Sequence, residues 1–459
     1  AEAEKTEKKA AVDEIDRLLP ARPAAGAWTA REHDDDLDIH SGTLANGVRA
    51  HVRTMDYKKN QVRVRITLPG GAIQEGADNR GITAAAVQAF QQTATAAFDS
   101  TRIKNFFTGK NVSVHGGADD DYIYLSISGA PAEIESGFQL AHLLLTEPRL
   151  EEAALNNWKT KLKTRYKMQQ FVAEGRLMQA LPRVAIPDDI RQHPLTPELV
   201  DKIELDAARA WLQKLVSQSG IEVAVVGDLA AETALDLVAT YLGSLPKRPE
   251  LTAELEGLRA VKTAEGPLEE VIPVTSIADR AACFVGWRTV GWQKQTEVLK
   301  IKMANMILRK RIREEIREKR GWTYSSGVFD RPSYAYRNVS FMGCFFTADP
   351  EKAMQALELA RKLIRDFAAA GPTADEVGVA RKQVANSLDQ ALKEPSFWVR
   401  KLAVLDYHHI TLAYLKGVDQ LYASFTPADI RAVLQTYITE ANRFQAIATT
   451  KPAAAKAKE

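Results

Sequence analysis

The feature that most restricts the fold of this chain is an order of predicted elements that occurs twice, on either side of a break at residues 246–270. The break combines prolines and glycines with many charged residues, a composition typical of a domain boundary. On each side we predict strands, a helix, more strands, several helices and a final strand. The sequence therefore predicts an α+β protein of two similar domains, each a mainly antiparallel sheet with helices packed on one face.

The predicted boundaries divide the chain into an N-terminal helix with linker, a first α+β domain, a domain linker, a second α+β domain and a polar tail, at residues 1–36, 37–247, 248–269, 270–450 and 451–459. The first part is rich in Ala, Glu, Lys and Pro and ends in Asp34-Asp35-Asp36, which we expect to be a solvated charge run. Its start has no apolar stretch like that of a signal peptide. Two histories fit: a mature chain whose signal has been removed, or the second part of a longer polypeptide.

Local patterns support the individual elements. Asn46-Gly47 between two strand-like arms is typical of a tight β-hairpin. Apolar and polar residues alternate from Val62 to Leu68, which predicts a half-buried antiparallel strand. Helices are predicted at residues 82–98, 132–145, 151–180, 197–215, 231–241, 295–319, 350–370, 374–393 and 397–407. Further strands are predicted at residues 221–226, 281–287, 324–329, 339–347 and 443–449.

Composition excludes several classes of protein. The formal net charge is +2, from 61 basic and 59 acidic residues, which gives no argument for a nucleic-acid partner. No apolar run approaches the roughly 20 residues that a membrane-spanning helix needs. The two cysteines, Cys283 and Cys344, lie in strand-like runs. We expect buried free thiols there, and one bridge between them stays open.

The eight histidines do not form a recognisable metal-binding motif. No pair has the His-x-x-Glu-His or His-x-x-x-His spacing that places two imidazoles on one helix face. The adjacent pair His408-His409 points in two directions and makes a poor chelate. For each lone histidine we favour a surface or core role, although a zinc site assembled from distant histidines stays open. The sequence also lacks the Gly-x-Ser-x-Gly motif of a nucleophile elbow, a phosphate-binding loop motif and a dinucleotide-binding motif.

A dense charge run at residues 309–320 ends in an unusual junction. Most of the run fits a solvated helix with Glu/Arg pairs three and four residues apart. The helix is predicted to stop at Gly321, and a strand is predicted to begin near Tyr324. Such a junction could place the helix-end Arg317 near Tyr324. A purely structural Arg317 would instead pair with Glu314, three residues back, and this alternative stays open.

At this junction the sequence resembles the pitrilysin/insulinase family of zinc metallopeptidases. The non-catalytic halves or subunits of that family often carry the pattern Arg-Glu-x-x-Gly-x-x-Tyr. Arg317 and Tyr324 fall on its arginine and tyrosine positions. The hairpin at 43–48, the strand end at 225–228 and the segment 241–246 are also similar to the family's first domain. The resemblance spans roughly residues 37–450.

The resemblance also shows a departure. Catalytic halves of the family carry Gly-x-x-His-x-x-Glu-His on the first helix of their first domain. Ala84, Val87 and Gln88 stand here where a zinc ligand, the general base and a second ligand would be. Alanine and valine cannot bind zinc or move a proton. The resemblance thus implies a chain with no cofactor of its own that cannot hydrolyse peptides alone.

The function that the resemblance implies is that of the second half of a clamshell. A partner half bearing His-x-x-Glu-His, fused or separate, would supply zinc and base. This chain would bind the peptide backbone through Arg317 and stabilise the oxyanion through Tyr324, so we expect both side chains to be solvent-accessible in the isolated chain. A non-proteolytic scaffold or a peptide-binding module of the same fold stays open as an alternative. We expect a periplasmic or otherwise exported protein, with a cytoplasmic location still open.

Overall fold

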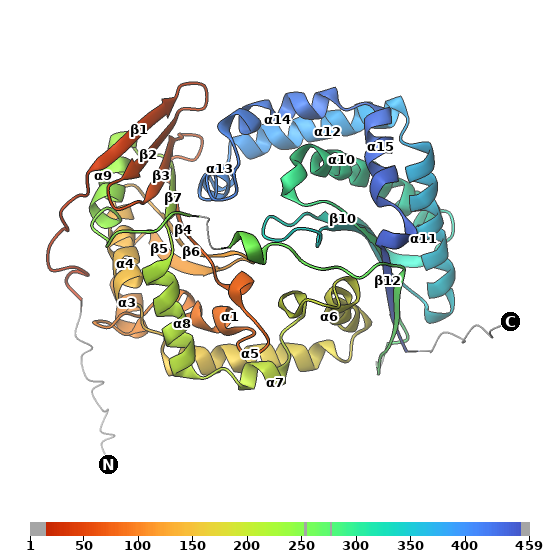
Figure 1. Ribbon diagram of the computed structural model, residues 1–459, viewed down its shortest axis with the longest axis horizontal. Coiled ribbons are helices and arrows are strands. Elements are labelled where there is room, and N and C mark those ends of the chain that lie inside the picture. Colours follow the sequence, from red (N-terminus) through yellow and green to blue (C-terminus); the bar gives the residue numbers. More distant parts are fainter. Residues whose placement is uncertain (1–14, 252–254, 276–277, 451–459) are drawn as a thin grey trace, which may run out of the picture.

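Two mixed β-sheets organise the protein (Figure 1). The computed structural model describes residues 15–251, 255–275 and 278–450, and the strands below belong to these residues. The first sheet has the order β1-β2-β3-β7-β4-β6-β5, with bounds Trp28–Asp34, Ile39–Leu44, Arg49–Thr54, Glu222–Gly227, Val62–Pro69, Tyr122–Gly129 and Val112–Ala118. The second has the order β10-β11-β9-β12-β8, with bounds Thr323–Arg331, Phe341–Ala348, Ala281–Arg288, Arg443–Thr449 and Leu268–Pro273.

The two sheets repeat one topology. Strands β3, β4, β5, β6 and β7 take the same places in the first sheet as β8, β9, β10, β11 and β12 take in the second. In each sheet the first and last of these strands pair in parallel, and the other neighbours pair antiparallel. The predicted α+β fold of two similar sheets is therefore confirmed. The β1–β2 hairpin is an addition to the first sheet alone.

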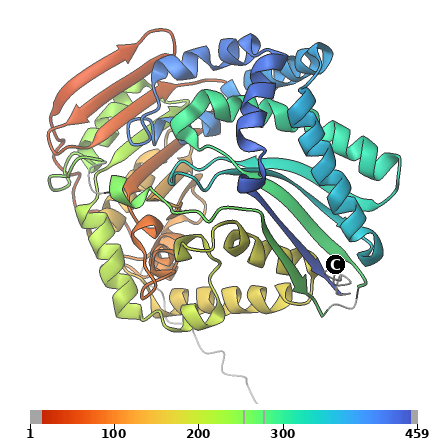
Figure 2. The same cartoon turned by 45° about the vertical axis from the view of Figure 1, so that its right-hand side comes forward.

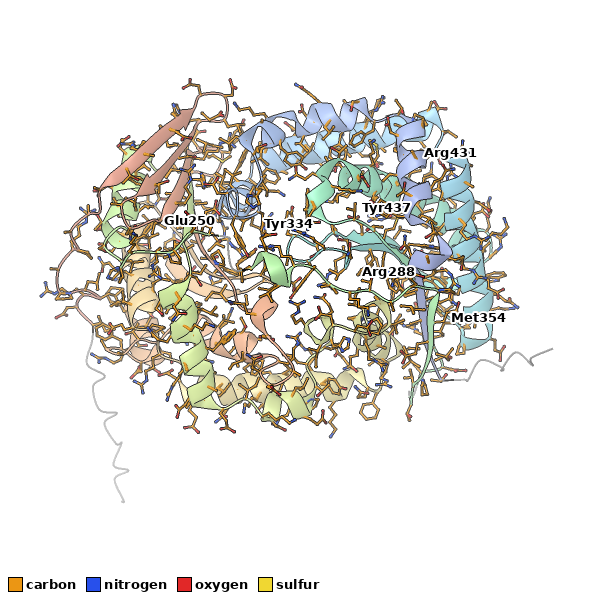
Figure 3. The ribbon with its side chains drawn as sticks, in the orientation of Figure 1. Glu250, Arg288, Tyr334, Met354, Arg431 and Tyr437 are labelled. Carbon is orange, nitrogen blue, oxygen red and sulfur yellow. The ribbon has the colours of Figure 1, made fainter. Side chains whose placement is uncertain are left out.

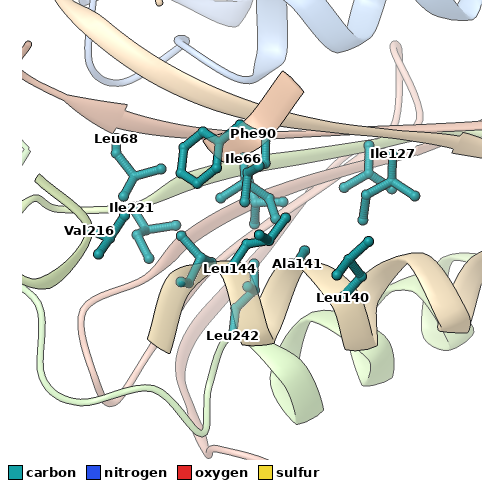
Figure 4. Packing of buried hydrophobic residues seen from close by; sticks show 14 of the residues in the cluster. Ile66, Leu68, Phe90, Ile127, Leu140, Ala141, Leu144, Val216, Ile221 and Leu242 are labelled. Carbon is teal, nitrogen blue, oxygen red and sulfur yellow. The ribbon is translucent and has the colours of Figure 1, made fainter. Parts of the chain in front are cut away.

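Helices from the same half cover the outer face of each sheet. The first half contains α1 to α9, at Ile82–Ala86, Gln88–Gln91, Ser100–Phe107, Ile134–Thr146, Glu152–Gln169, Ala173–Ala185, Pro197–Asp201, Leu205–Gln218 and Ala231–Tyr241. The second half contains α10 to α15, at Gln295–Ile312, Pro350–Ala370, Ala374–Leu392, Pro395–Leu402, Leu412–Ser424 and Pro427–Tyr437. Figure 4 shows Leu140 and Leu144 of α4 facing Ile66 and Ile127 of the first sheet. The alternating strand pattern places these apolar side chains on one face.

The inner faces of the sheets exchange helices. Helix α6 of the first half packs on β12, β9 and β8 of the second sheet, whereas α13 of the second half packs on β7 and β4 of the first (Figures 1 and 2). Trp398 of α13 is fully buried there, and the Arg53 guanidinium lies 3.6 Å from the centre of its ring. The two halves are thus interlocked, because each completes the hydrophobic core of the other.

The N-terminal prediction was wrong within the described residues. Residues 15–27 contain no helix, and Trp28–Asp34 forms the edge strand β1 rather than a linker. Residues 1–14 and the predicted tail at 451–459 lie outside the described residues. The Asp run is not simply solvated, because Asp34 and Asp36 each lie 2.7 Å from the Lys416 ammonium of α14. Backbone pairing with β2 decided this segment over its composition.

Three predicted helices are broken, since the one predicted at 197–215 is divided into α7 and α8. The helix predicted at 82–98 is divided into α1 and α2 at Val87, and it ends before Thr95, whose amide and hydroxyl both bond to the backbone of Phe98. Such local hydrogen bonds compete with the helix. The helix predicted at 151–180 is divided into α5 and α6.

The domain linker is firmly docked. Arg259 is buried in it and lies 2.6 Å from the Asp121 carboxylate of the first half. Strand β8 begins at Leu268, inside the predicted linker range. Cys283 and Cys344 are buried free thiols and do not form a disulfide.

Candidate functional site

Helix α1 and the residues after it contain the positions to which the resemblance assigns the zinc motif, and the side chains there cannot hold the metal. Val87, between α1 and α2, is buried, and the Gln88 amide nitrogen at the start of α2 donates to the carbonyl of Ala84 in α1 at 2.9 Å. Ala84 offers no donor atom. These three residues supply neither the imidazoles nor the carboxylate that a zinc site with a general base requires. The chain therefore does not fit zinc at this position, and no catalytic step can be assigned to α1.

The start of α1 is nevertheless held rigidly. The buried carboxylate of Glu75 accepts hydrogen bonds from the backbone amides of Gly81 at 2.7 Å and Thr83 at 2.9 Å. The Arg80 guanidinium pairs with the same carboxylate at 2.5 Å. Gly81 has φ of 92°, a conformation that glycine adopts without strain. Glu75 satisfies amides at a helix N-terminus that would otherwise lie unpaired in the core.

Arg317 lies in the second half of the chain, in a short stretch of π-helix. Residues Arg313–Glu318 continue α10 as a π-helical segment, in which the amide of Lys319 bonds to the carbonyl of Glu314. Arg317 is exposed, and within the described residues its guanidinium makes no hydrogen bond or ion pair. The expected alternative, a pair with Glu314, is not formed. Segments of π-helix are frequent at functional sites.

The acidic neighbours of Arg317 have other partners. Glu314 lies 3.8 Å from the Lys310 ammonium, and Glu318 lies 3.1 Å from the Arg313 guanidinium. Glu315 pairs with Arg320 at 2.9 Å and also with Lys319. Arg317 is thus left as an exposed cation that can bind a group outside this chain.

Tyr324 follows on the edge strand of the second sheet. Gly321, with φ of 62°, ends the helix and turns the chain into β10. The register of β10 with β11 shifts between Thr323 and Ser325, so Tyr324 is the extra residue of a β-bulge. Bulges redirect side chains, and the Tyr324 ring is 56% exposed.

The Tyr324 hydroxyl has a partner within the chain. It donates to the Asp349 carboxylate at the start of α11, and the guanidinium carbon of Arg280 lies 5.2 Å from the centre of its ring. The hydrogen bond to Asp349 and the charge of that carboxylate raise the pKa of Tyr324, because both disfavour the phenolate. Both predicted residues are solvent-accessible, as expected, but the hydroxyl of Tyr324 is not free.

A cavity of about 400 Å³ lies between the two halves. Tyr334 lines it near the centre of the molecule (Figure 3) and stacks on Trp292, with ring centres 4.4 Å apart. The Lys401 ammonium lies 3.1 Å from the Tyr334 hydroxyl, and burial together with nearby Lys302 lowers the pKa of Lys401 to about 8. Asp120 lies on the opposite wall, where burial raises its pKa.

Two buried polar clusters join the halves beside this cavity. In the first, Asp121 lies 2.6 Å from Arg259 and 3.0 Å from His408. Burial alone would raise the pKa of Asp121, but these two partners lower it.

In the second cluster the fully buried His51 bonds to Ser41 at 2.8 Å and to Glu222 at 3.1 Å, and it lies 3.5 Å from Asp406. Burial alone would lower the pKa of His51, but the two carboxylates raise it. Glu222 also accepts the backbone amides of Asp406 and Tyr407 from the other half.

Comparison with known families decides the affiliation of the chain. Residues 202–384 match the family model described as "Peptidase M16 inactive domain". Residues 202–384 thus carry the inactive domain of the M16 peptidases, the pitrilysin/insulinase family.

Curated relatives of this M16 chain are longer than it is. The probable zinc protease PqqL of Escherichia coli is 23% identical, with 77% of this chain and 38% of that protein covered. The chloroplastic stromal processing peptidase of Pisum sativum is 19% identical, with 90% and 36% covered. This M16 chain therefore spans little more than a third of the curated relatives that it matches.

Solved structures share the fold of this M16 chain. The periplasmic protease PqqL of Escherichia coli matches with a TM-score of 0.81 at 18% identity, over 97% of this chain and 49% of that chain. A peptidase M16 inactive domain from Pseudomonas fluorescens matches with a TM-score of 0.78 at 18% identity, over 91% of this chain and 100% of that chain. Among the described residues, no helix combines the length and apolar character that a membrane crossing needs.

Sequence reasoning missed several residues of this M16 chain. Asp349 and Arg280 contact Tyr324 from other elements, and Glu75 caps α1 from a preceding turn. The sequence contained one usable signal, Asp349 directly before the proline that begins α11. Long-range pairing decided the rest.

Proposed function

We propose that this chain is the substrate-positioning half of a two-half zinc metallopeptidase, and that it is inactive without a zinc-bearing half. The observation that carries the proposal is the exposed guanidinium of Arg317, without a partner in the described residues, seven positions before the exposed Tyr324. The lack of zinc ligands on α1 supports the second part.

In this proposal Arg317 and Tyr324 act on the peptide that the other half cleaves. The guanidinium is a fork of donors that binds a backbone carbonyl or a carboxylate of the peptide. The Tyr324 hydroxyl donates to the carbonyl oxygen on which negative charge develops. The hydroxyl must turn away from Asp349 to do so, so Asp349 holds it in place until substrate enters. Zinc and the general base come from the partner half.

The partner proposed here is a half of similar fold that carries the His-x-x-Glu-His motif, fused or as a separate subunit of a heterodimer. This chain covers 49% of the PqqL chain, and the first half of PqqL also matches it, with a TM-score of 0.70 at 15% identity. The periplasmic location given for PqqL supports an exported location for this chain.

A second candidate function is a non-proteolytic scaffold. A chain of complex III2 from Candida albicans shares the fold, with a TM-score of 0.68 at 12% identity. The Tyr324 hydroxyl also has an internal acceptor in Asp349, which a purely structural tyrosine would have.

The test is peptide turnover by this chain assembled with a half that carries the zinc motif. Tyr324→Phe should lower turnover by about a hundredfold or more, the loss that follows removal of one oxyanion donor. Arg317→Ala should raise KM as well, because it removes a contact to the substrate. Tyr57→Phe and Arg313→Ala are matched controls, since Tyr57 is also exposed and Arg313 lies in the same π-helical segment. Near-normal turnover in Tyr324→Phe would favour the scaffold.

A further inference from the structure

The β1–β2 hairpin carries a cluster of histidines and aspartates that the proposed function does not use. This hairpin is the part of the first sheet that has no counterpart in the second, and it lies at the upper left of Figure 1, in red. His33 on β1 and His40 on β2 are direct cross-strand partners, so their side chains lie on the same face. The turn between them contributes Asp35 and Asp38, and Asp38 adopts φ of 50°.

The ligand atoms of this cluster converge. The Nε2 atoms of His33 and His40 lie 3.1 and 3.8 Å from the same oxygen, Oδ1 of Asp38. The two imidazole rings are stacked, with centres 4.1 Å apart and planes inclined by 9°. One ligand atom from each of the three residues lies within 4.8 Å of the other two. Zinc bonds of about 2.0–2.2 Å correspond to ligand separations of about 3.3 Å in a tetrahedron, so small side-chain rotations suffice.

The outer partner of the cluster is also in place. The Nδ1 atom of His33 lies 3.0 Å from Oδ1 of Asp35, while Nε2 of the same ring faces Asp38. A carboxylate on the far nitrogen orients a metal-bound histidine and raises its basicity. Asp35 is therefore a positioning residue rather than a ligand.

Solvent can reach the cluster. The side chains of His33, His40 and Asp38 are 40%, 25% and 57% exposed, so a hydrated ion can enter and keep a water as its fourth ligand. The neighbouring carboxylates Asp34 and Asp36 pair with Lys416, whereas Asp35 and Asp38 face the histidines.

We propose that His33, His40 and Asp38 form a surface site for a divalent transition metal, with zinc as the ion tested. Imidazole and carboxylate ligands in this ratio suit Zn²⁺ and disfavour Mg²⁺ and Ca²⁺, which prefer oxygen ligands alone. The site is separate from the α1 position. A bound ion stabilises the β1–β2 hairpin, whose Asp34 pairs with Lys416 on α14 of the second half.

A second cluster in the chain meets the distance criterion but not the chemistry. His51, Glu222 and Asp406 also lie within 4.8 Å of one another. Two backbone amides already occupy the carboxylate of Glu222, and Arg49 occupies that of Asp406. The hairpin cluster is the one whose lone pairs remain accessible to a metal ion from solvent.

The experiment is calorimetric titration of the whole chain with Zn²⁺ alone, after treatment with a chelator. We expect one saturable site, with affinity reduced at least tenfold in His40→Ala and in Asp38→Asn, and a smaller reduction in Asp35→Asn. His115→Ala is the matched control, because His115 is an exposed strand histidine with Arg63 and Arg65 nearby. The affinity of this variant for Zn²⁺ should equal that of the wild type. Circular dichroism checks that each variant is folded.

Spectroscopy and melting make the test sharper. Co²⁺ in place of Zn²⁺ should show visible absorption typical of four-coordinate cobalt, and His40→Ala should abolish it. Zn²⁺ should raise the Tm of the wild type and of His115→Ala but not of His40→Ala. Binding that is equal in His40→Ala and wild type, or reduced equally in His115→Ala, would overturn the site.

Discussion

Helices α1 and α10 occupy equivalent places in the two halves, yet they differ in length, burial and charge. Each follows the equivalent strand of its sheet, β4 or β9, and precedes the next strand, β5 or β10. Helix α1 has five residues, is mostly buried and begins on the capping carboxylate of Glu75. Helix α10 has 18 residues and runs into the charged π-helical segment that holds Arg317.

The difference shows how one topology can serve two tasks. In the first half the helix is a structural element whose catalytic positions hold Ala84 and Val87. In the second half the end of the helix projects charged side chains into solvent beside the edge strand. The sheets preserve the framework, while the chemistry depends on the side chains at this one helix in each half.

The largest expected effect concerns activity. The chain alone should cleave no peptide, with or without added Zn²⁺, because α1 has no ligand for the metal and no general base. Peptide cleavage is followed by mass spectrometry over many hours. Cleavage by the purified chain that requires Zn²⁺ and stops with a chelator would contradict the statement that α1 is only a structural helix.

The next effect concerns stability at the two helix starts. Glu75→Gln should lower the free energy of unfolding by about 3 kcal/mol, because it removes a buried charge that pairs with Arg80 and caps two amides. Glu297→Gln, in the first turn of α10, should cost less than about 1 kcal/mol, since its contacts lie near the surface. Urea unfolding measures both. Equal losses would contradict the contrast between the helix starts.

A smaller effect concerns pH at the junction of the halves. The pKa of His51 is raised in the folded protein, so its protonated form stabilises the fold fully below about pH 6.5. This contribution should be lost as pH rises above 6.5 through the raised pKa. The groups that face it are Glu222, Asp406, Arg49 and the Ser41 hydroxyl.

The measurement is the free energy of unfolding between pH 5 and 9. His51→Gln should flatten the decline above pH 6.5, whereas His115→Gln should preserve it. The pKa of the exposed His115 is lowered by partial desolvation of its ring and by the charges of Arg65 and Arg63, so this residue contributes no loss in that range. An unchanged profile in His51→Gln would locate the pH dependence elsewhere.

The smallest effect concerns Tyr324 itself. Asp349→Asn should bring the pKa of Tyr324 down toward about 10, because the carboxylate that disfavours the phenolate is gone. Ultraviolet difference titration against Tyr324→Phe isolates this one tyrosine. An identical titration in Asp349→Asn and wild type would mean that the Tyr324 hydroxyl does not bond to Asp349 in solution. The hydroxyl would then have no partner in Asp349, as the Arg317 guanidinium has none in Glu314.

Some elements could be predicted to the residue. Helix α11 begins at Pro350 and ends at Ala370, and β12 spans Arg443–Thr449, both as expected. Proline at the first helical position and glycine just after the last one are local signals that need no tertiary contact. The broken helix at 82–98 could not be predicted in the same way, because its ending depends on hydrogen bonds around Thr95.

The candidate site divides in the same manner. The positions of Arg317 and Tyr324 followed from their spacing and from Gly321, and the exposure expected for both agrees with the structure. Their roles stay predictions. The π-helical segment, the bulge and the bond to Asp349 could not be predicted, because each depends on how α10, β10 and β11 meet in space.

The sequence by itself determined that two similar α+β units follow one another and that the first lacks the His-x-x-Glu-His motif, because periodicity and residue identity are local properties. Only the tertiary structure decided that α6 packs on the second sheet and α13 on the first, since the inner face of each sheet is completed by a helix from the other half. The same holds for the hairpin cluster: His33 and His40 are seven positions apart, and only antiparallel pairing makes them neighbours.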